Sequence, residues 1–261
     1  MKLFILFLNL MILVCSAQAE TKRLRPTVYY TQVMDMDKKC LTEEKRIIFL
    51  DAKYMDVGPR ALHSKKNKPI AACQSVYKKC AIEGSCALVN SRGRSLEQLA
   101  EENIEIINYQ AQGKNTGRYY FSHIDEKQCP YGLGVKKICL DPFFTVAADL
   151  NFYKTGDVIY LPSLKGVKLP TGEVHDGYMI VRDRGGAIKG SQRFDFYSGF
   201  LPYMHPKNVF SELGLANEKN KEIFFEKVTE AKVIEEVHRQ RNFPLVPLEN
   251  TQETFIRSIA Q

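Results

Sequence analysis

Short apolar or alternating stretches recur along the whole chain and are separated by glycine, proline and polar turns. Stretches of this length, rich in β-branched and aromatic residues, are typical of β-strands. The segments with this pattern are residues 27–31, 46–51, 80–90, 104–109, 118–123, 143–150, 157–161, 178–181, 194–197 and 222–228. Helical periodicity is limited to residues 95–100, 229–241 and 252–260, while residues 69–80 fit either a strand or a short helix. Many short strands and few helices predict a mainly β protein of sandwich or barrel type.

Two aspartates lie at the ends of neighbouring predicted strands and are joined by a glycine-rich loop. Asp183 follows the strand at 178–181, and Asp195 lies within the next strand. We expect Gly185 and Gly186 to need positive φ or a close backbone approach, so that Gly186→Val would destroy folding or activity. Carboxylates at loop–strand junctions are a common way to build a site. The alternative is that Asp183 only caps the glycine turn through nearby backbone amides.

The first 19 residues have the pattern of a secretory signal peptide. A basic Lys2 precedes an apolar run at 3–14, and residues 17–19 read Ala-Gln-Ala, which is a cleavage site of the A-x-A type. The run is shorter than the roughly 20 residues of a membrane-spanning helix, and no second long apolar run follows. Val14 precedes Cys15 where a lipid anchor requires a small residue. We therefore expect an exported protein, periplasmic or secreted, without a lipid anchor or a transmembrane segment.

Charge and cysteine content agree with export. The net charge of +7 is spread along the chain and suits an anionic extracellular polymer as well as it suits nucleic acid, but the signal peptide argues against nucleic acid. Six of the seven cysteines follow the predicted cleavage site, and an even number in an exported chain predicts disulfides and no free thiol. Cys129 with Cys139 is the most local pairing. Because the cysteines lack paired CxxC spacing, neither a metal site nor a cofactor is expected.

Four segments combine into a longer motif. Segment 147–149 reads Ala-Ala-Asp, 156–160 leads into a strand, 183–190 reads Asp-Arg-Gly-Gly-Ala-Ile-Lys-Gly, and 194–199 reads Phe-Asp-Phe-Tyr-Ser-Gly. In order and spacing these segments resemble the core of the MltA family of lytic murein transglycosylases, which is the 3D domain named for three aspartates. The glycine-rich segment is the most specific part of this resemblance.

Weaker matches to the same family lie upstream, at residues 29–31, 83–85 and 113–115. The segment between Tyr30 and Glu83 is shorter than the family usually carries, so its inserted domain is expected to be reduced. The spacing from Asp183 to Asp195 is one residue longer than in the family, which suggests a bulge within 191–193.

The resemblance implies a double-psi β-barrel with a small inserted β-rich domain and a C-terminal helix. The barrel would comprise residues 24–45 and 117–235, with the 3D core at about 140–200. Residues 46–116 would form the inserted domain and 236–261 the C-terminal tail. A groove between barrel and insertion would bind a glycan strand.

The resemblance also implies an activity: non-hydrolytic cleavage of the MurNAc–GlcNAc β-1,4 bond of peptidoglycan by a monomeric enzyme. Asp195 matches the family's catalytic residue, and Asp183 and Asp149 match its two supporting aspartates. The expected substrate-binding residues are Tyr30, Glu83, Gly84, Ser85, Asn115, Gly185, Gly186 and Lys189.

The chemistry requires a carboxylic acid that is protonated near neutral pH, so burial or a neighbouring carboxylate must raise the pKa of Asp195. Two alternatives remain open. With Glu83 facing the groove, a two-carboxylate hydrolase becomes feasible, although Glu83 could simply replace a family glutamine. A barrel of this kind could also bind peptidoglycan or a partner without cleaving it. Asp149 is more often a turn-stabilising residue in such a site than a reactive one.

Overall fold

The computed structural model describes residues 22–36, 39–40, 45–54, 61–64, 67–89, 104–114, 116–125, 127–215 and 222–246. The strands in these ranges are β1 Lys22–Arg23, β2 Arg25–Tyr29, β3 Gln32–Asp35, β4 Arg46–Ile48, β5 Leu50–Asp51, β6 Ala71–Cys73, β7 Ser85–Val89, β8 Glu105–Gln112, β9 Tyr119–Ile124, β10 Thr145–Ala148, β11 Val158–Tyr160, β12 Tyr178–Asp183, β13 Arg193–Tyr197 and β14 Phe224–Lys227. The α-helices are α1 Gln74–Glu83, α3 Val209–Glu212 and α4 Ala231–Gln240, and short 3-10 turns occur at Ala52–Tyr54, Val135–Lys137 and Pro162–Leu164. The mainly β prediction is confirmed. The predicted signal peptide and the predicted helices at 95–100 and 252–260 lie outside the described residues.

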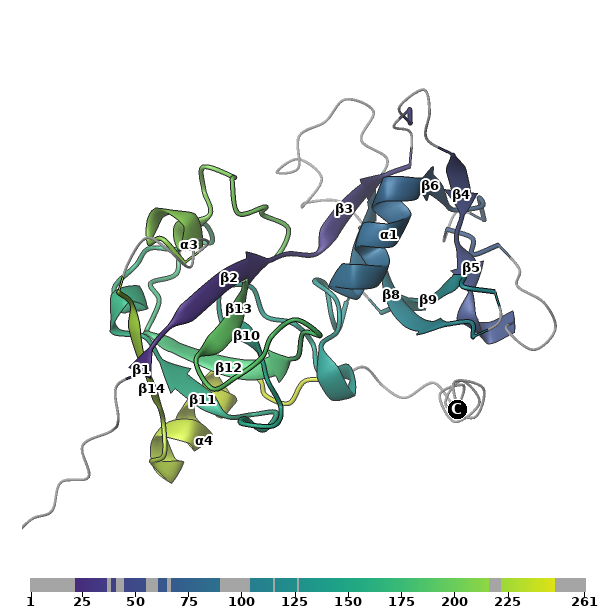
Figure 1. Cartoon of the computed structure of the whole chain (residues 1–261). Coiled ribbons are helices and arrows are strands. Elements are labelled where there is room, and N and C mark those ends of the chain that lie inside the picture. Colours follow the sequence, from purple (N-terminus) through teal and green to yellow (C-terminus); the bar gives the residue numbers. More distant parts are fainter. Residues whose placement is uncertain are drawn as a thin grey trace, which may run out of the picture.

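The larger lobe is built on a seven-stranded sheet in the order β1-β14-β11-β12-β10-β13-β2 (Figure 1). The pairs β10–β12 and β13–β2 are parallel, whereas the other pairs are antiparallel. Alternation along β13 places Phe194 and Phe196 in the main core, together with Val146 and Val181 of the neighbouring strands. The alternate residues of β13, which include Asp195, therefore face the other side of the sheet. The double-psi connectivity stays a prediction.

The second lobe contains a five-stranded sheet in the order β3-β7-β8-β9-β5, with α1 packed beside it. Figure 1 shows the two lobes side by side, with β2 running directly into β3 from one lobe to the other. β3 and β9, which lie outside the range expected for the insertion (46–116), also pair in this sheet; the expected boundaries stay a prediction. Strand pairing between residues far apart in sequence builds this sheet, and no local pattern marks it.

The segment at 80–90 corrects the strand prediction. Residues up to Glu83 belong to α1, Gly84 ends the helix with a φ of 85°, and β7 begins at Ser85. The amide of Gly84 donates to the Cys80 carbonyl at 3.0 Å, which closes the last helical turn. Left-handed φ at a helix end suits glycine. The ambiguous segment at 69–80 divides into β6 and the start of α1.

The six described cysteines are all paired, which confirms the disulfide prediction. The bonds are Cys40–Cys73, Cys80–Cys86 and the predicted local bond Cys129–Cys139. The last bond packs with Ala87, Ile106 and Ile124 of the second lobe. This cluster also includes Leu133 and Phe200, so it joins the connection after β9 and the loop after β13 to the five-stranded sheet.

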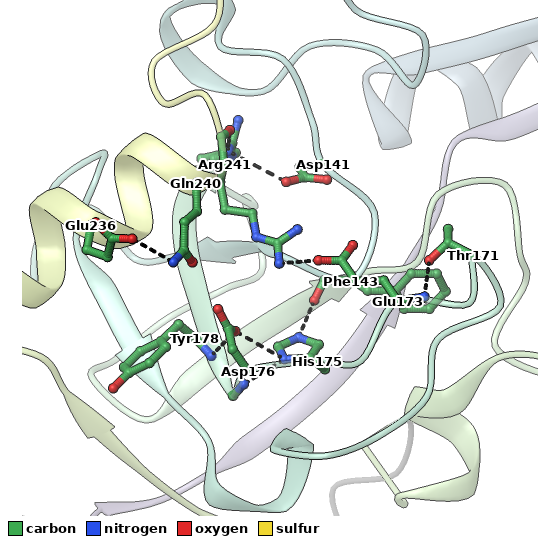
Figure 2. Close-up of polar contacts among 12 residues, drawn as sticks. Asp141, Phe143, Thr171, Glu173, His175, Asp176, Tyr178, Glu236, Gln240 and Arg241 are labelled. Atoms are coloured by element: carbon green, nitrogen blue, oxygen red, sulfur yellow. Dashed lines mark hydrogen bonds and ion pairs between the residues drawn. The ribbon is translucent and has the colours of Figure 1, made fainter.

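A polar network, in which His175 is buried and Glu173 is exposed, connects the C-terminal part of the described chain to the seven-stranded sheet (Figure 2). The Arg241 guanidinium donates to Glu173 at 2.6 Å and lies 3.2 Å from the centroid of the Phe144 ring. His175 Nδ1 accepts from the Gly177 amide at 2.8 Å, and Nε2 lies 2.9 Å from the Phe143 carbonyl. A ring nitrogen that accepts carries no proton, so this geometry selects neutral His175 with its proton on Nε2. Burial lowers the pKa of His175, which also favours the neutral form.

Candidate functional site

Strand register brings the candidate carboxylates into one row across four strands. Asp195 of β13 pairs with Ala147 of β10 on one side and with Thr27 of β2 on the other. Ala147 in turn pairs with Asp183 of β12, next to a register shift between Val146 and Ala147. Neighbouring strands lie about 4.8 Å apart, so the small Ala147 side chain separates two carboxyl groups that are two strands apart. The row points away from the core that Phe194 and Phe196 fill.

The second lobe contributes a third carboxyl group. Glu83 is the last residue of α1, and its side chain interacts electrostatically with both Asp195 and Asp183. Tyr30, in the link between β2 and β3, is half-buried and interacts with Glu83. The candidate site therefore lies where the two lobes meet, as expected for Tyr30 and Glu83.

Burial dominates the electrostatics of the three carboxyl groups. It raises the pKa of Glu83 to about 7, that of Asp183 to about 7 and that of Asp195 to about 6. The charge of Asp195 contributes to the raised pKa values of Glu83 and Asp183, while the nearby Thr27 hydroxyl and Arg193 guanidinium hold the pKa of Asp195 down. Burial thus keeps all three carboxyl groups protonated to a higher pH than in water, and the group exchanges protons near neutral pH. The required raised pKa of Asp195 is present.

Asp183 makes one local contact and one contact across the sheet. Its Oδ1 accepts from the backbone amide of Arg184 at 2.8 Å, which is a local turn contact. Its Oδ2 accepts from the Tyr29 hydroxyl at 3.1 Å, across 154 residues of sequence. The Tyr29 and Tyr197 rings lie 5.0 Å apart, so aromatic side chains flank the row of carboxyl groups.

The Asp195 carboxyl group is incompletely satisfied by the described part of the chain. Asp195 Oδ1 and Thr27 Oγ1 are both buried without a hydrogen-bond partner of normal geometry in that part. Thr27 acts on the pKa of Asp195 but through a contact looser than a standard hydrogen bond. A buried oxygen without a donor is unfavourable for stability and is often found where a ligand or water completes the site.

Asp149 lies at the far end of the glycine-rich loop and stabilises it. Its oxygens accept from the Gly190 amide at 2.9 Å and from the Asn151 amide and side chain at 3.1 and 2.9 Å. These donors, helped by Lys189, lower the pKa of Asp149, so this carboxylate stays ionised. The Lys189 side chain is exposed. The geometry agrees with a supporting rather than a reacting Asp149.

The glycine turn corrects part of the sequence prediction. Gly185 needs to be glycine because an added Cβ would lie 2.5 Å from Ile188 Cγ1. Gly186 is exposed, lacks left-handed φ and has open space where a Cβ would lie, so the predicted failure of Gly186→Val loses its basis. Positive φ occurs instead at Gly190. The extra residue within 191–193 is taken up by a turn before β13, whose pairing with β2 is regular.

Ser85 and Gly84, two further residues expected to bind substrate, make contacts within the second lobe. Ser85 is buried, and its hydroxyl donates to Asn108 at 2.7 Å and accepts from the Leu133 amide at 3.3 Å. Gly84 ends α1, and its carbonyl accepts from Tyr109. These contacts fix the end of α1, where Glu83 lies, and the predicted contact of Gly84 and Ser85 with substrate stays a prediction. Asn115 lies outside the described residues.

The site contains residues that the sequence analysis did not select, namely Thr27, Tyr29, Arg193 and Tyr197. The available signal was strand alternation: Thr27 and Tyr29 share one face of β2, and Arg193 and Tyr197 flank Asp195 on one face of β13. The juxtaposition of these two strands, which are far apart in the sequence, is visible only in the fold.

Within the described residues, no group of His, Cys, Asp and Glu side chains has an arrangement that could hold a metal ion. In the same ranges, every helix is too short or too polar to cross a membrane.

We compared the chain with family models, curated proteins and solved structures. Residues 144–203 match the family model of the 3D domain, so the chain contains a 3D domain as the motif predicted. No curated protein matches the chain in sequence. Among solved structures the chain is similar to E. coli MltA with bound chitohexaose, at 17% identity and a TM-score of 0.45, over 80% of this chain and 72% of that one.

Two other solved structures show similarity of the same order. The membrane-bound lytic murein transglycosylase from Agrobacterium tumefaciens is 16% identical, with a TM-score of 0.43 over 83% of this chain and 78% of that one. The lytic transglycosylase LtgG of Burkholderia pseudomallei is 12% identical, with a TM-score of 0.36 over 80% of this chain and 73% of that one.

Proposed function

We propose that the protein is an exported peptidoglycan lytic transglycosylase that cleaves MurNAc–GlcNAc β-1,4 bonds and leaves 1,6-anhydro-MurNAc ends. The observation that carries the proposal is the Asp195 carboxyl group, which burial keeps partly protonated beside two further carboxyl groups. The 3D domain match and the motif at 183–199 support the same assignment.

One carboxyl group suffices for this reaction. Protonated Asp195 donates its proton to the glycosidic oxygen as the C1–O bond breaks and positive charge develops on the sugar ring. The C6 hydroxyl oxygen of the same sugar then bonds to C1, and its proton passes to the Asp195 carboxylate. The acid is regenerated and no water is consumed. Burial raises the pKa of Asp195 to about 6, so a protonated fraction remains near neutral pH.

The neighbouring groups favour this chemistry. Burial raises the pKa values of Glu83 and Asp183 to about 7, so both groups are partly protonated near neutral pH. When Glu83 and Asp183 are neutral, they do not repel the Asp195 carboxylate that forms before the C6 hydroxyl proton is transferred. Asp183, held by Tyr29, and Asp149, bound to Gly190, fix the two ends of the glycine-rich loop beside the proposed glycan path. Gly185, Gly186 and Lys189 on this loop are proposed to contact the glycan.

A second candidate is a hydrolase that uses two carboxyl groups, because Glu83 lies within electrostatic range of Asp195 and has a strongly raised pKa of about 7. Glu83 would be the acid, and Asp195 would be the base or nucleophile. A non-catalytic peptidoglycan-binding module is the third reading.

Variants separate these readings. Asp195→Asn keeps the size of the side chain but removes the proton, and is expected to reduce release of muropeptides from purified murein by about 10²–10⁴-fold. Glu83→Gln is expected to retain most of the release, and Glu212→Gln, an exposed acid on α3, is the matched control. Equal losses in Asp195→Asn and Glu83→Gln would favour the hydrolase. Murein binding without any release by the wild type would favour the binding module.

A further inference from the structure

A disulfide closes a loop where the chain passes from the second lobe back to the first. β9 belongs to the second lobe and β10 to the first, and the connection between them contains the Cys129–Cys139 bond. Within this Cys129–Cys139 loop, the Gly132 amide donates to the Cys129 carbonyl at 3.2 Å, and the Gly132 carbonyl accepts from the Leu140 amide at 3.0 Å. Closing a short loop with a covalent bond removes conformational freedom from it. The loop is therefore a fixed local unit between the lobes.

The tip of this loop packs against the turn that ends α1. The Leu133 amide donates to the Ser85 hydroxyl at 3.3 Å, and Ser85 lies two residues after Glu83. Gly132 has a φ of 107°, and an added Cβ would lie 2.5 Å from Ser85 Oγ. A glycine with left-handed φ lets the loop backbone approach Ser85 this closely. The position of the α1 end is thereby linked to the position of the loop.

The tip also contacts β13 and the link between β2 and β3. The Tyr131 carbonyl accepts from the Tyr197 hydroxyl at 2.8 Å and from the Thr31 hydroxyl at 2.6 Å. Tyr197 lies two residues after Asp195, on the same face of β13. The Tyr197 and Thr31 side chains are both buried, so these hydrogen bonds are shielded from water.

The base of the loop contacts β12. The Cys139 carbonyl accepts from Arg182 Nη1 at 3.0 Å, and Arg182 directly precedes Asp183. The Arg182 side chain is buried, so its hydrogen bond to this carbonyl is costly to lose. The Cys139 amide donates to the Leu245 carbonyl at 2.8 Å, which adds the C-terminal part of the described chain to the same junction.

One loop therefore contacts near neighbours of all three carboxyl groups of the site. Glu83 lies on the second lobe, whereas Asp183 and Asp195 lie on the first, so their separation depends on how the lobes are held together. The groups that act electrostatically on Glu83 are Asp195 and Asp183 from the first lobe, Lys79 of α1, and Tyr30 in the link. Because burial and the two aspartates raise the pKa of Glu83, this pKa reports how closely the lobes approach.

We propose that the Cys129–Cys139 loop is a positioning element that holds Glu83, at the end of α1, against the two aspartates of the first lobe. The loop acts through Ser85, Tyr197 and Arg182 and does not itself touch the glycan. The positioning follows from these contacts, and its use in glycan cleavage rests on the proposed function.

Two variants loosen the loop in different ways. The double variant Cys129→Ser with Cys139→Ser removes the covalent closure and keeps side chains of similar size. Gly132→Ala keeps the disulfide but places a methyl group against Ser85. Both changes are expected to move the end of α1 away from the first lobe. If the double variant does not fold, Gly132→Ala decides the outcome.

Each variant has a matched control outside the junction. Cys40→Ser with Cys73→Ser also removes one disulfide from the second lobe, but Cys73 lies at the other end of α1 from Glu83. Gly172→Ala also places alanine at a left-handed φ, here 86°, but its Cβ would meet nothing within 4 Å. The controls thus reproduce the lost crosslink and the backbone strain without disturbing the junction.

The primary readout is the pKa of Glu83, measured by ¹³C NMR titration of its carboxyl group and assigned with Glu83→Gln. In the loop variants this pKa is expected to fall by at least about 1, from about 7 toward its ordinary 4.5, because the carboxyl group becomes hydrated and leaves the aspartates. The controls are expected to keep the wild-type pKa. Circular dichroism and thermal unfolding establish which variants are folded.

An unchanged Glu83 pKa in a folded loop variant, or an equal fall in the controls, would overturn the positioning role. Kinetics of muropeptide release form a separate arm. The loop variants are expected to raise the KM for murein strands and to change kcat little, since Asp195 stays within its own sheet. A lowered Glu83 pKa together with an inactive wild type would support the loop's role and contradict the proposed function. An unchanged Glu83 pKa with an active wild type would contradict the loop's role alone.

Discussion

Replacing Asp195 by asparagine is expected to stabilise the folded protein at neutral and alkaline pH while it removes activity. In the folded state the carboxylate of Asp195 is buried and Oδ1 lacks a donor among the described residues, whereas in the unfolded chain the carboxylate is hydrated. Folding therefore favours the protonated acid. An asparagine amide has a similar shape but never ionises, so it avoids this unfavourable desolvation.

The magnitude follows from the pKa of Asp195, which rises from its ordinary 3.8 to about 6 on folding. Each pKa unit corresponds to about 1.4 kcal/mol, so ionised Asp195 lowers the free energy of unfolding by about 3 kcal/mol. The asparagine still buries a polar atom without a partner, which offsets part of the gain. A net gain of about 1–3 kcal/mol remains, equivalent to roughly 2–10 °C in Tm for a protein of this size.

The effect of Asp195 on the free energy of unfolding depends on pH, and this dependence identifies the buried carboxylate as its cause. Below pH 3.8 the carboxyl group is protonated in both states and contributes no difference. The destabilisation develops as the pH rises from 3.8 to about 6 and is complete above that value.

Urea and thermal unfolding of wild type and Asp195→Asn are measured at pH 4 and pH 8 with the disulfides intact. Glu212→Gln serves as the control, since this exposed side chain lies on α3 outside the site. A gain for Asp195→Asn at pH 8 that nearly vanishes at pH 4 is the expected result. An equal change at both pH values, or destabilisation at pH 8, would refute the claim that a buried carboxylate causes the effect.

Three other predictions concern the surroundings of the site. Because folding lowers the pKa of His175, the unfolded chain binds more protons than the folded chain below pH 6.5. The free energy of unfolding is therefore expected to fall as the pH drops below 6.5, and His175→Gln should make this fall less steep. Gly185→Ala is expected to lower the Tm, whereas Gly186→Ala should leave it nearly unchanged, and identical Tm values for the two variants would contradict the contact argument. Asp149→Ala removes the acceptor for the Gly190 amide and is expected to lower the urea midpoint of unfolding. An unchanged midpoint would show that the loop does not depend on it.

The parts of the fold that local patterns encode were accessible from the sequence. The alternation in 194–197 and the apolar run at 178–181 correspond to β13 and β12, and the glycine turn between them lies where it was expected. The local Cys129–Cys139 bond was accessible for the same reason, since few residues separate its ends. The segment at 80–90 failed because apolar and small residues fit a strand and a helix end equally well, and the choice depends on packing of α1 against the second sheet.

Only part of the candidate site could be predicted from the sequence, because its residues come together through strand pairing between distant parts of the chain. Asp183 and Asp195 stand out in a motif, but Thr27 and Tyr29 come from a strand that pairs with β13 across most of the chain. Glu83 approaches Asp195 only because the second lobe places the end of α1 against the first. Gly186 illustrates the opposite case: two adjacent glycines read alike in sequence, and only Gly185 faces a side chain that excludes a Cβ.

The central claim, that Asp195 alone transfers the proton in a reaction without water, is tested most directly by the mass of the wild-type products. Purified murein is digested in ¹⁸O-labelled water, and the released muropeptides are analysed by mass spectrometry. We predict 1,6-anhydro-MurNAc ends that are lighter than hydrolysed ends by one water and carry no ¹⁸O. Reducing ends that incorporate ¹⁸O would contradict the account and identify a hydrolase.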